Sequence, residues 1–184
     1  MSRKVLLMTG DGGDSYEALF AYQRFLEAGW TPVVAAPNRR RLHMIIQDFE
    51  PGWDTHIERV GHSIESDVAI TAVAAREFAA VLVLGGRAPE YLRNDASVIS
   101  LMREFWEQKK GLFAIGHGIQ VLAAAELLRG RTVACHTNVR VEVERSGGLY
   151  SPKSAVRDGK IVTGQNWKSH PDFYREVFAC LALS

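Results

Sequence analysis

The sequence predicts an α/β fold in which helices cover both faces of a mostly parallel β-sheet, with a small antiparallel hairpin at the sheet's edge. Two observations lead to this prediction. Short, continuous apolar runs recur along the chain, as in parallel strands that are buried on both faces. Between them lie longer stretches whose apolar residues repeat with helical spacing. The 184 residues, 47% of them hydrophobic, suffice for one compact domain, so we expect residues 1–184 to form a single domain.

The predicted elements follow one another as strand, helix, strand, helix, which favours right-handed crossovers and a doubly wound sheet. The predicted strands of the central sheet are residues 5–8, 32–36, 80–84 and 112–115. The predicted helices are residues 16–28, 97–108, 119–128, 139–146 and 171–181. Between residues 39 and 66, short segments in which polar and apolar residues alternate predict the small antiparallel hairpin at the sheet's edge, called the antiparallel excursion below. A further strand is expected at Thr132–Cys135. Asp158-Gly159 marks a second hairpin.

Charge and cysteine content exclude several classes of protein. With 22 Lys+Arg against 21 Asp+Glu, the net charge is +1, which provides no global field for nucleic acid or an anionic membrane. We therefore expect neither as a partner, and a small molecule instead. The first apolar run, Val5–Met8, is far shorter than a membrane span of about 20 residues. Two cysteines form no disulfide framework or zinc motif, so a cytoplasmic location is expected.

Ligands of open parallel sheets bind beyond the carboxyl ends of the strands, which here means the glycine-rich loops after Met8, Leu84 and Ile115. The first loop has Ser15 where a dinucleotide fingerprint needs its third glycine, and no phosphate-binding loop occurs, so no nucleotide cofactor is expected. The third loop runs directly into a helix and has the shape of a nucleophile elbow. Its central position is Gly116, which has no nucleophile to offer.

At these loops the chain resembles the ThiJ/PfpI superfamily, relatives of the class I glutamine amidotransferases, and most closely the PfpI-like intracellular protease/amidase branch. The segments that carry the resemblance are residues 85–93, 117–122, 127–131, 156–163 and 167–173, so it covers nearly the whole chain. The resemblance implies a flavodoxin-like three-layer sandwich. It also implies self-association, because relatives form dimers and hexamers.

The resemblance assigns roles to individual residues. The family's elbow reads Ala-Ile-Cys-His-Gly, and its nucleophilic cysteine corresponds to Gly116. His117 corresponds to the histidine after that cysteine, and Glu90 to the acid that reaches the histidine from a neighbouring subunit. Glu17 corresponds to the carboxylate that hydrogen-bonds the cysteine. The backbone N–H groups of Gly86 and His117 would form the oxyanion hole.

Further ligand-binding residues are expected in the neighbouring loops. Gly85 belongs to the same turn as Gly86, His136 stands where relatives often carry a tyrosine facing the site, and the loop of Trp167 and His170 matches one that lines the pocket. Side chains alternate along a strand, so if His136 faces the pocket, Cys135 faces away from it.

Other candidates have ordinary structural explanations. Cys135 and Cys180 are expected in the core. His117, His136 and Glu17 form a set that can bind a divalent metal, but histidines from separate loops are more often ordinary hydrogen-bonded residues, so neither metal nor cofactor is expected. His56 and His62 are expected to face solvent. Arg87 is expected to pair with an acid across a subunit boundary.

Two functional hypotheses remain. In the favoured one, the protein lacks cysteine-dependent amidase, protease or glyoxalase activity and keeps a pocket for a small carbonyl or anionic ligand, because glycine cannot supply the thiolate. In the alternative, it is a non-covalent hydrolase, lyase or hydratase in which His117 with Glu90 activates water or a bound metal.

Overall fold

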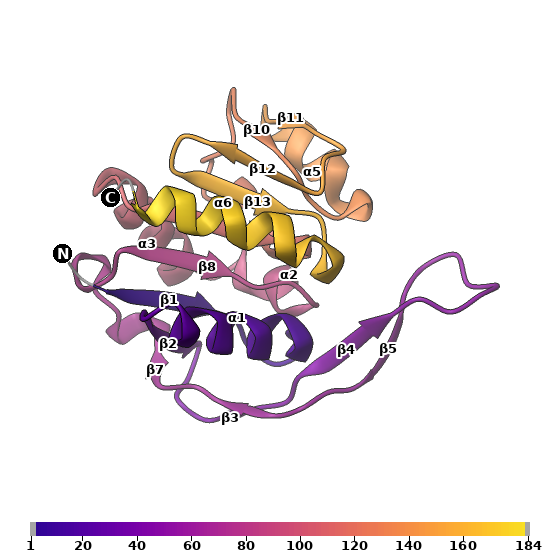
Figure 1. The fold of residues 1–184 in the computed structure, drawn as a ribbon, viewed down its shortest axis with the longest axis horizontal. Coiled ribbons are helices and arrows are strands. Elements are labelled where there is room, and N and C mark those ends of the chain that lie inside the picture. The colour runs from indigo at the N-terminus through magenta and orange to yellow at the C-terminus, as the bar shows by residue number, and fades with distance from the viewer. Residues whose placement is uncertain (1–2, 183–184) are drawn as a thin grey trace.

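The computed structural model describes residues 3–182 and has the predicted layered architecture (Figure 1). Its central sheet has seven strands in the order β12-β13-β9-β8-β1-β2-β7. Every neighbouring pair is parallel except β12 and β13, which form the hairpin predicted at Asp158-Gly159. The strands are β1 (Lys4–Met8), β2 (Thr31–Ala36), β7 (Val68–Ala69), β8 (Ala80–Val83), β9 (Gly111–Ile115), β12 (Ala155–Asp158) and β13 (Ile161–Gly164).

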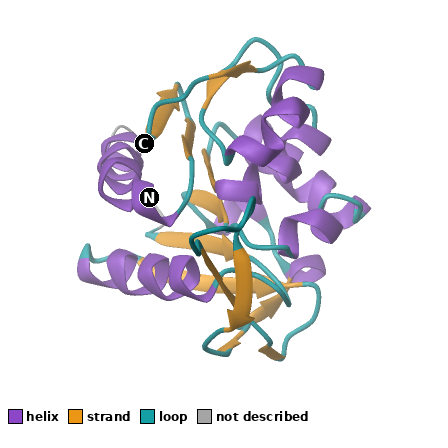
Figure 2. Cartoon of the chain, turned by 90° about the vertical axis from the view of Figure 1, so that its right-hand side faces the viewer, coloured by secondary structure: helices purple, strands orange, loops and turns teal. Residues whose placement is uncertain are grey.

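Helices lie on both sides of this sheet (Figure 2). They are α1 (Ser15–Glu27), α2 (Ala88–Leu92), α3 (Ala96–Glu107), α4 (Ile119–Ala124), α5 (Arg140–Arg145) and α6 (His170–Ala182). Side chains cap the two N-termini next to the sheet's loops: Asp14 accepts hydrogen bonds from the N–H groups of Tyr16 and Glu17, and Asp95 accepts one from Ser97. Gly29 follows α1 with φ +74°, the expected helix stop.

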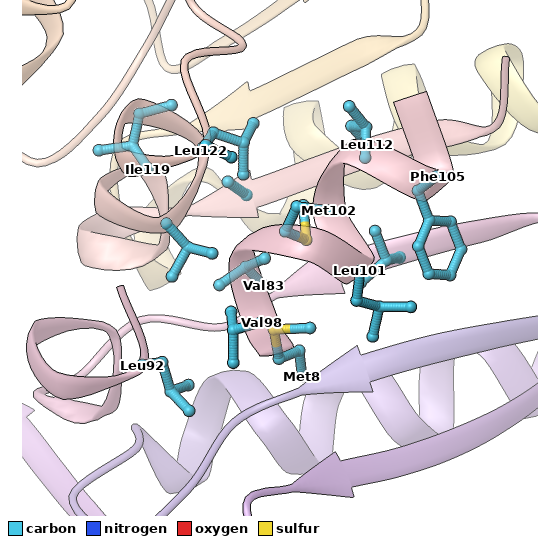
Figure 3. Packing of buried hydrophobic residues seen from close by; sticks show 14 of the residues in the cluster. Met8, Val83, Leu92, Val98, Leu101, Met102, Phe105, Leu112, Ile119 and Leu122 are labelled. Atoms are coloured by element: carbon cyan, nitrogen blue, oxygen red, sulfur yellow. The ribbon is translucent and has the colours of Figure 1, made fainter. Parts of the chain in front are cut away.

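The four strands at the centre of the sheet, β13, β9, β8 and β1, are buried on both faces and divide their side chains between two cores. Leu6 and Met8 belong to the core under α2, α3 and α4, whereas Val5 and Leu7 belong to the core under α1 and α6. Figure 3 shows α3 in the first core, where its four buried residues pack over the sheet. These residues are Val98, Leu101, Met102 and Phe105. Each buried side chain of this size contributes about 1.5–3 kcal/mol, which holds the sheet's loops on a rigid base.

The antiparallel excursion is confirmed as two small ladders. Strand β3 (Arg41–Leu42) pairs with β6 (Ile64–Glu65), and β4 (Ile45–Asp48) pairs with β5 (Ile57–Val60). The β4–β5 hairpin projects from the body of the molecule beyond the carboxyl ends of the strands (Figure 1). It therefore stands beside the loops where a ligand is expected.

Three expectations differ from the structure. The helix predicted over 119–128 ends at Ala124, because Glu126 adopts φ +64° and turns Leu128 into the core. The strand predicted over Thr132–Cys135 is confined to β10 (Thr132–Val133), which pairs with β11 (Leu149–Tyr150) outside the central sheet. The short helix α2 was not predicted, since its five residues are too few to show a period. Among residues 3–182, no helix is long and apolar enough to cross a membrane.

Candidate functional site

A pocket lies where the loops after β1, β8, β9 and β13 meet the β4–β5 hairpin. Its interior leaves about 20 Å³ for water-sized groups, and the whole hollow, including its open mouth, measures about 320 Å³. Several predicted site residues meet here, together with others that were not predicted. The lining consists of Asp14, Glu17, Gln47, Phe49, His56, Gly86, Gly116, His117, His136, Asn166 and Trp167.

Gly116 is the first residue after β9 and begins a short 3-10 turn that leads directly into α4. Its φ is +58°, the left-handed conformation expected at a nucleophile elbow. A Cβ built on it would lie 3.6 Å from Glu17 Oε1 and 3.7 Å from the Gln165 carbonyl oxygen, so the space admits a small side chain. Gly116 therefore has the backbone of an elbow position and carries no side chain.

Glu17 lies in the first turn of α1, where the cap by Asp14 fixes its backbone. Its Oε2 accepts a 2.7 Å hydrogen bond from the N–H of Gly85, and the side chain is buried. Burial and, secondarily, the nearby charge of Asp14 raise the pKa of Glu17 to about 8, although the Gly85 hydrogen bond opposes this shift. At neutral pH Glu17 is therefore largely a neutral acid.

Gly86 joins the second loop to the first. It has φ +80°, and a Cβ on it would lie 2.4 Å from the backbone nitrogen of Asp14, which no side chain tolerates. On either side of Gly86 the loops exchange backbone hydrogen bonds, from Asp14 N to Gly85 O at 3.3 Å and from Arg87 N to Gly12 O at 2.7 Å. Glycine at this position thus allows the close approach that builds one wall of the pocket.

Three histidines meet in the pocket. The ring centroids of His117 and His136 are 5.1 Å apart, and His56 lies 5.9 Å from His117 and 5.6 Å from His136. His56 was expected to face solvent; this expectation is wrong, because the β4–β5 hairpin turns the ring back over the elbow. Burial, the nearby His136 and then His56 lower the pKa of His117 to about 4, and burial with His56 lowers that of His136.

The aromatic residues after β13 separate into two roles. Trp167 lines the pocket as the resemblance implied. His170, in contrast, is buried outside the pocket and stacks on Tyr16 and Phe20, with ring centroids 5.4 and 4.4 Å away. Neither ring nitrogen of His170 has a hydrogen-bond partner within the described chain, and burial lowers its pKa to about 4.

Neither cysteine lines this pocket. Cys135 belongs to the core under α4, while its neighbour His136 lines the pocket, so the expected opposite orientation is confirmed. Burial, followed by the charges of Glu142 and Glu144, raises the pKa of Cys135 to about 12. Cys180 lies in the other core.

Glu90 does not reach this pocket within one chain. It is exposed on α2 and lines a separate hollow with Asp11, Gly12, Arg87 and Tyr91. Arg87 was expected to seek an acid across a subunit boundary, but its Nε lies 2.7 Å from Glu58 Oε2 on β5 of the same chain. This ion pair ties the projecting hairpin to the second loop.

The set His117, His136 and Glu17 was weighed above as a metal site. Within residues 3–182, no three His, Cys, Asp or Glu side chains are arranged to hold a metal ion.

Residues 3–179 match the DJ-1/PfpI family along almost the whole chain. The chain belongs to the DJ-1/PfpI family. It is 30% identical over 189 residues to Protein DJ-1 homolog D of Arabidopsis thaliana, covering 99% of this chain and 48% of that protein. The chain thus spans about half the length of that relative. With Protein/nucleic acid deglycase 2 of Escherichia coli it shares 28% identity over 183 residues, covering 98% of this chain and 99% of that protein.

Solved DJ-1/PfpI structures share the fold. A ThiJ/PfpI domain protein from Brachyspira murdochii superposes with a TM-score of 0.87 at 23% sequence identity, covering 100% of this chain and 98% of that one. Family membership and the mostly parallel seven-stranded sheet are therefore established for this chain.

Sequence reasoning about this DJ-1/PfpI chain missed part of the pocket. Asp14, Gln47, Phe49, His56 and Asn166 line it but were not predicted. Asp14 could have been found from its place just before a helical period, where it is a typical N-cap. Gln47, Phe49 and His56 come from the excursion, and local sequence carries no signal for the direction in which a projecting hairpin folds back.

Proposed function

We propose that this DJ-1/PfpI protein has no cysteine-dependent amidase, protease or deglycase activity and instead binds a small carbonyl or anionic ligand above Gly116. The observation that carries this proposal is the empty elbow: Gly116 has the backbone of a nucleophile position and borders a pocket, yet both cysteines are buried in the cores. Covalent chemistry of the family's kind needs a thiolate at this point. In the ligand-binding role, the N–H groups of Gly86 and His117 receive the ligand's oxygen.

The ligand is small in this proposal. Water-sized groups can occupy only about 20 Å³ of the interior, so one oxygen-bearing group enters and the remainder stays at the mouth against Phe49 and Trp167. Relatives with deglycase names include Protein/nucleic acid deglycase 2 of Escherichia coli and a deglycase of Thermococcus kodakarensis. A small carbonyl compound as ligand agrees with those names.

A second candidate function has one observation in its favour, the opposite pKa shifts of two pocket residues. Glu17 is held protonated near neutral pH and His117 is held neutral, which are the states of a general acid and a general base. A non-covalent hydrolase, lyase or hydratase could use this pair on a water above Gly116. Glu90, which the sequence hypothesis assigned to this role, would have to come from another subunit of a dimer or hexamer.

Replacing Gly116 tests both candidates. We expect the unchanged protein and Gly116→Ala to be inactive toward glyoxals and amide substrates, whereas Gly116→Cys gains both reactivity toward thiol reagents and measurable turnover. The alanine variant is the matched control, because it carries the same backbone strain without a thiol. Turnover by the unchanged protein that disappears in His117→Ala would replace the first candidate by the second. A folded, inactive and unreactive Gly116→Cys would contradict the claim that only the thiol is missing.

A further inference from the structure

The pocket's third histidine arrives from a part of the chain that carries none of the family's elbow residues. His56 lies just before β5, on the tip side of the projecting hairpin, whereas His117 follows β9 and His136 follows β10. The three ring centroids form a triangle with sides of 5.1, 5.6 and 5.9 Å. Three separate elements thus bring three imidazoles to one point above Gly116.

Hydrogen bonds hold two of these rings in place. The Nε2 of His56 lies 2.8 Å from the side-chain nitrogen of Gln47, across the β4–β5 ladder. The Nδ1 of His136 accepts a 3.3 Å hydrogen bond from the N–H of Asn138, so in neutral His136 the proton is on Nε2, which is a donor. No side-chain hydrogen bond of His117 is found within the described residues, which leaves both ring nitrogens for a ligand.

The polar lining offers both donors and acceptors to a ligand. The ring of His117 has one donor and one acceptor nitrogen, and His136 offers its Nε2 donor. Asn166 keeps its amide donor, because its Oδ1 already accepts a hydrogen bond from the N–H of Lys168. A hydroxyl group also donates and accepts, whereas a carboxylate can only accept and an ammonium group can only donate. The lining therefore matches the hydrogen-bonding capacity of a hydroxylated molecule.

The charges around the pocket disfavour an anion. Asp14 and Glu17 line it, while no lysine or arginine of residues 3–182 does. Asp14 accepts hydrogen bonds from the N–H groups of Tyr16, Glu17 and Gln47, which stabilise its carboxylate, while burial raises the pKa of the group. Lys168 stands at the rim, with its ammonium 5.3 Å from the ring centroids of both Phe49 and Trp167. A carboxylate ligand would have to enter beside the carboxyl group of Asp14 without a cation in the lining.

We propose that His56 is a ligand-contacting residue and that His56, His117 and His136 together select a small, neutral, hydroxyl-bearing compound over carboxylates of the same size. This inference rests on the proposed function, since it names the ligand class of the same pocket. It narrows that class from carbonyl or anionic compounds to uncharged hydroxycarbonyl compounds. The hairpin is then a part of the binding site, tied in place by the Arg87–Glu58 ion pair.

Two three-carbon compounds of different charge test the proposal on the full chain at pH 7.5. The probes are 1,3-dihydroxyacetone, which is neutral, and lactate, which is an anion. Imidazole nitrogen signals in two-dimensional NMR report binding at the three histidines. We expect dihydroxyacetone to shift all three sets of signals together and to bind at least tenfold more tightly than lactate.

Three variants separate a ligand contact from a structural role. His56→Phe should weaken dihydroxyacetone binding at least tenfold, whereas His56→Gln, which keeps a donor and an acceptor, should restore part of it. His62→Ala is the matched control, because His62 is exposed on the same excursion and is absent from the pocket's lining. Thermal unfolding of each variant verifies that the fold is intact.

Several results would overturn the proposal: tighter binding of lactate, unchanged binding in folded His56→Phe, no binding of any probe at large excess, or one zinc ion per chain that is lost in His56→Phe. Conversion of dihydroxyacetone to a product, visible in the same spectra, would refute the non-catalytic function while leaving the charge preference measurable. Failure of the proposed ligand class can therefore be distinguished from failure of the proposed non-catalytic function.

Discussion

A side chain at Gly116 would face the carboxyl group of Glu17, because a Cβ at that position would lie 3.6 Å from Glu17 Oε1. The acid that the family resemblance pairs with a thiol thus lies beside a residue that has no side chain. Glycine relieves the backbone at this point, since φ is +58° and residues with a side chain adopt this conformation at a cost.

The first prediction compares three glycines with positive φ. Gly116→Ala should lower the free energy of unfolding by about 1–3 kcal/mol from backbone strain, with no clash. Gly130→Ala is the matched control, since Gly130 has φ +69° and open space around it, and should cost about the same. Gly86→Ala should cost clearly more, because its Cβ would meet the Asp14 nitrogen at 2.4 Å. Urea unfolding measures the loss of stability in each of the three variants. Equal losses of stability would show that the two loops can move apart around Gly86.

Glu17 should make stability fall as pH rises. Its folded pKa of about 8 lies above the ordinary value of 4.5, so its contribution is fully present below pH 4.5 and is lost as pH rises toward 8. In Glu17→Gln, which keeps an acceptor for the Gly85 N–H, this loss should vanish. Glu27→Gln, an exposed change on the same helix, is the control and should retain the wild-type slope. Unfolding midpoints measured between pH 5 and 8 test this prediction. If the midpoints of Glu17→Gln and Glu27→Gln changed with pH in the same way, the raised pKa of Glu17 would be refuted.

The central sheet was predictable because its strands are buried on both faces, which leaves continuous apolar runs such as Ala80–Val83 with no need of distant context. The elbow was predictable for the same reason, since the chain must turn where such a run ends at Gly116. The sequence did not reveal the direction in which segments and side chains turn in the folded protein. Nothing around His56 distinguishes a ring that turns back over β9 from one in solvent, and nothing around Arg87 identifies Glu58 as its partner.

Element ends were harder to predict than the elements themselves. Residues 119–128 have a helical period, yet Glu126 leaves the helical conformation so that Leu128 can enter the core. Burial of one leucine contributes about 1.5–3 kcal/mol, which exceeds what one more helical turn with good propensity provides. Periodicity alone does not show whether helix propensity or the burial of a later side chain contributes the larger free energy.

Cys135 should be inert in the native protein. Burial raises the pKa of its thiol to about 12, and it lies in a core rather than in the pocket. At pH 8 we expect a thiol reagent to label Cys135 no faster than the protein unfolds, and Cys135→Ala to leave ligand binding unchanged. Cys180→Ala serves as the parallel control for a buried cysteine in the other core. Rapid labelling at Cys135 would revive it as a substitute nucleophile.

His170 should make the protein sensitive to acid. Its folded pKa of about 4 lies below the ordinary 6.5, so its contribution to stability is present above pH 6.5 and is lost as pH falls toward 4. Neither ring nitrogen has a partner in the described structure, and the ring stacks on Phe20 at 4.4 Å. His170→Phe keeps the ring and removes the two unpartnered nitrogens, so it should raise stability at pH 7 by about 1–2 kcal/mol. Between pH 6.5 and 5, His170→Phe should also lose less stability than the unchanged protein. The exposed substitution His62→Phe should lose as much stability as the unchanged protein does. Urea unfolding at the two pH values measures the effect, and a His170→Phe protein that is less stable at pH 7 would mean that the ring nitrogens hold a water or another partner.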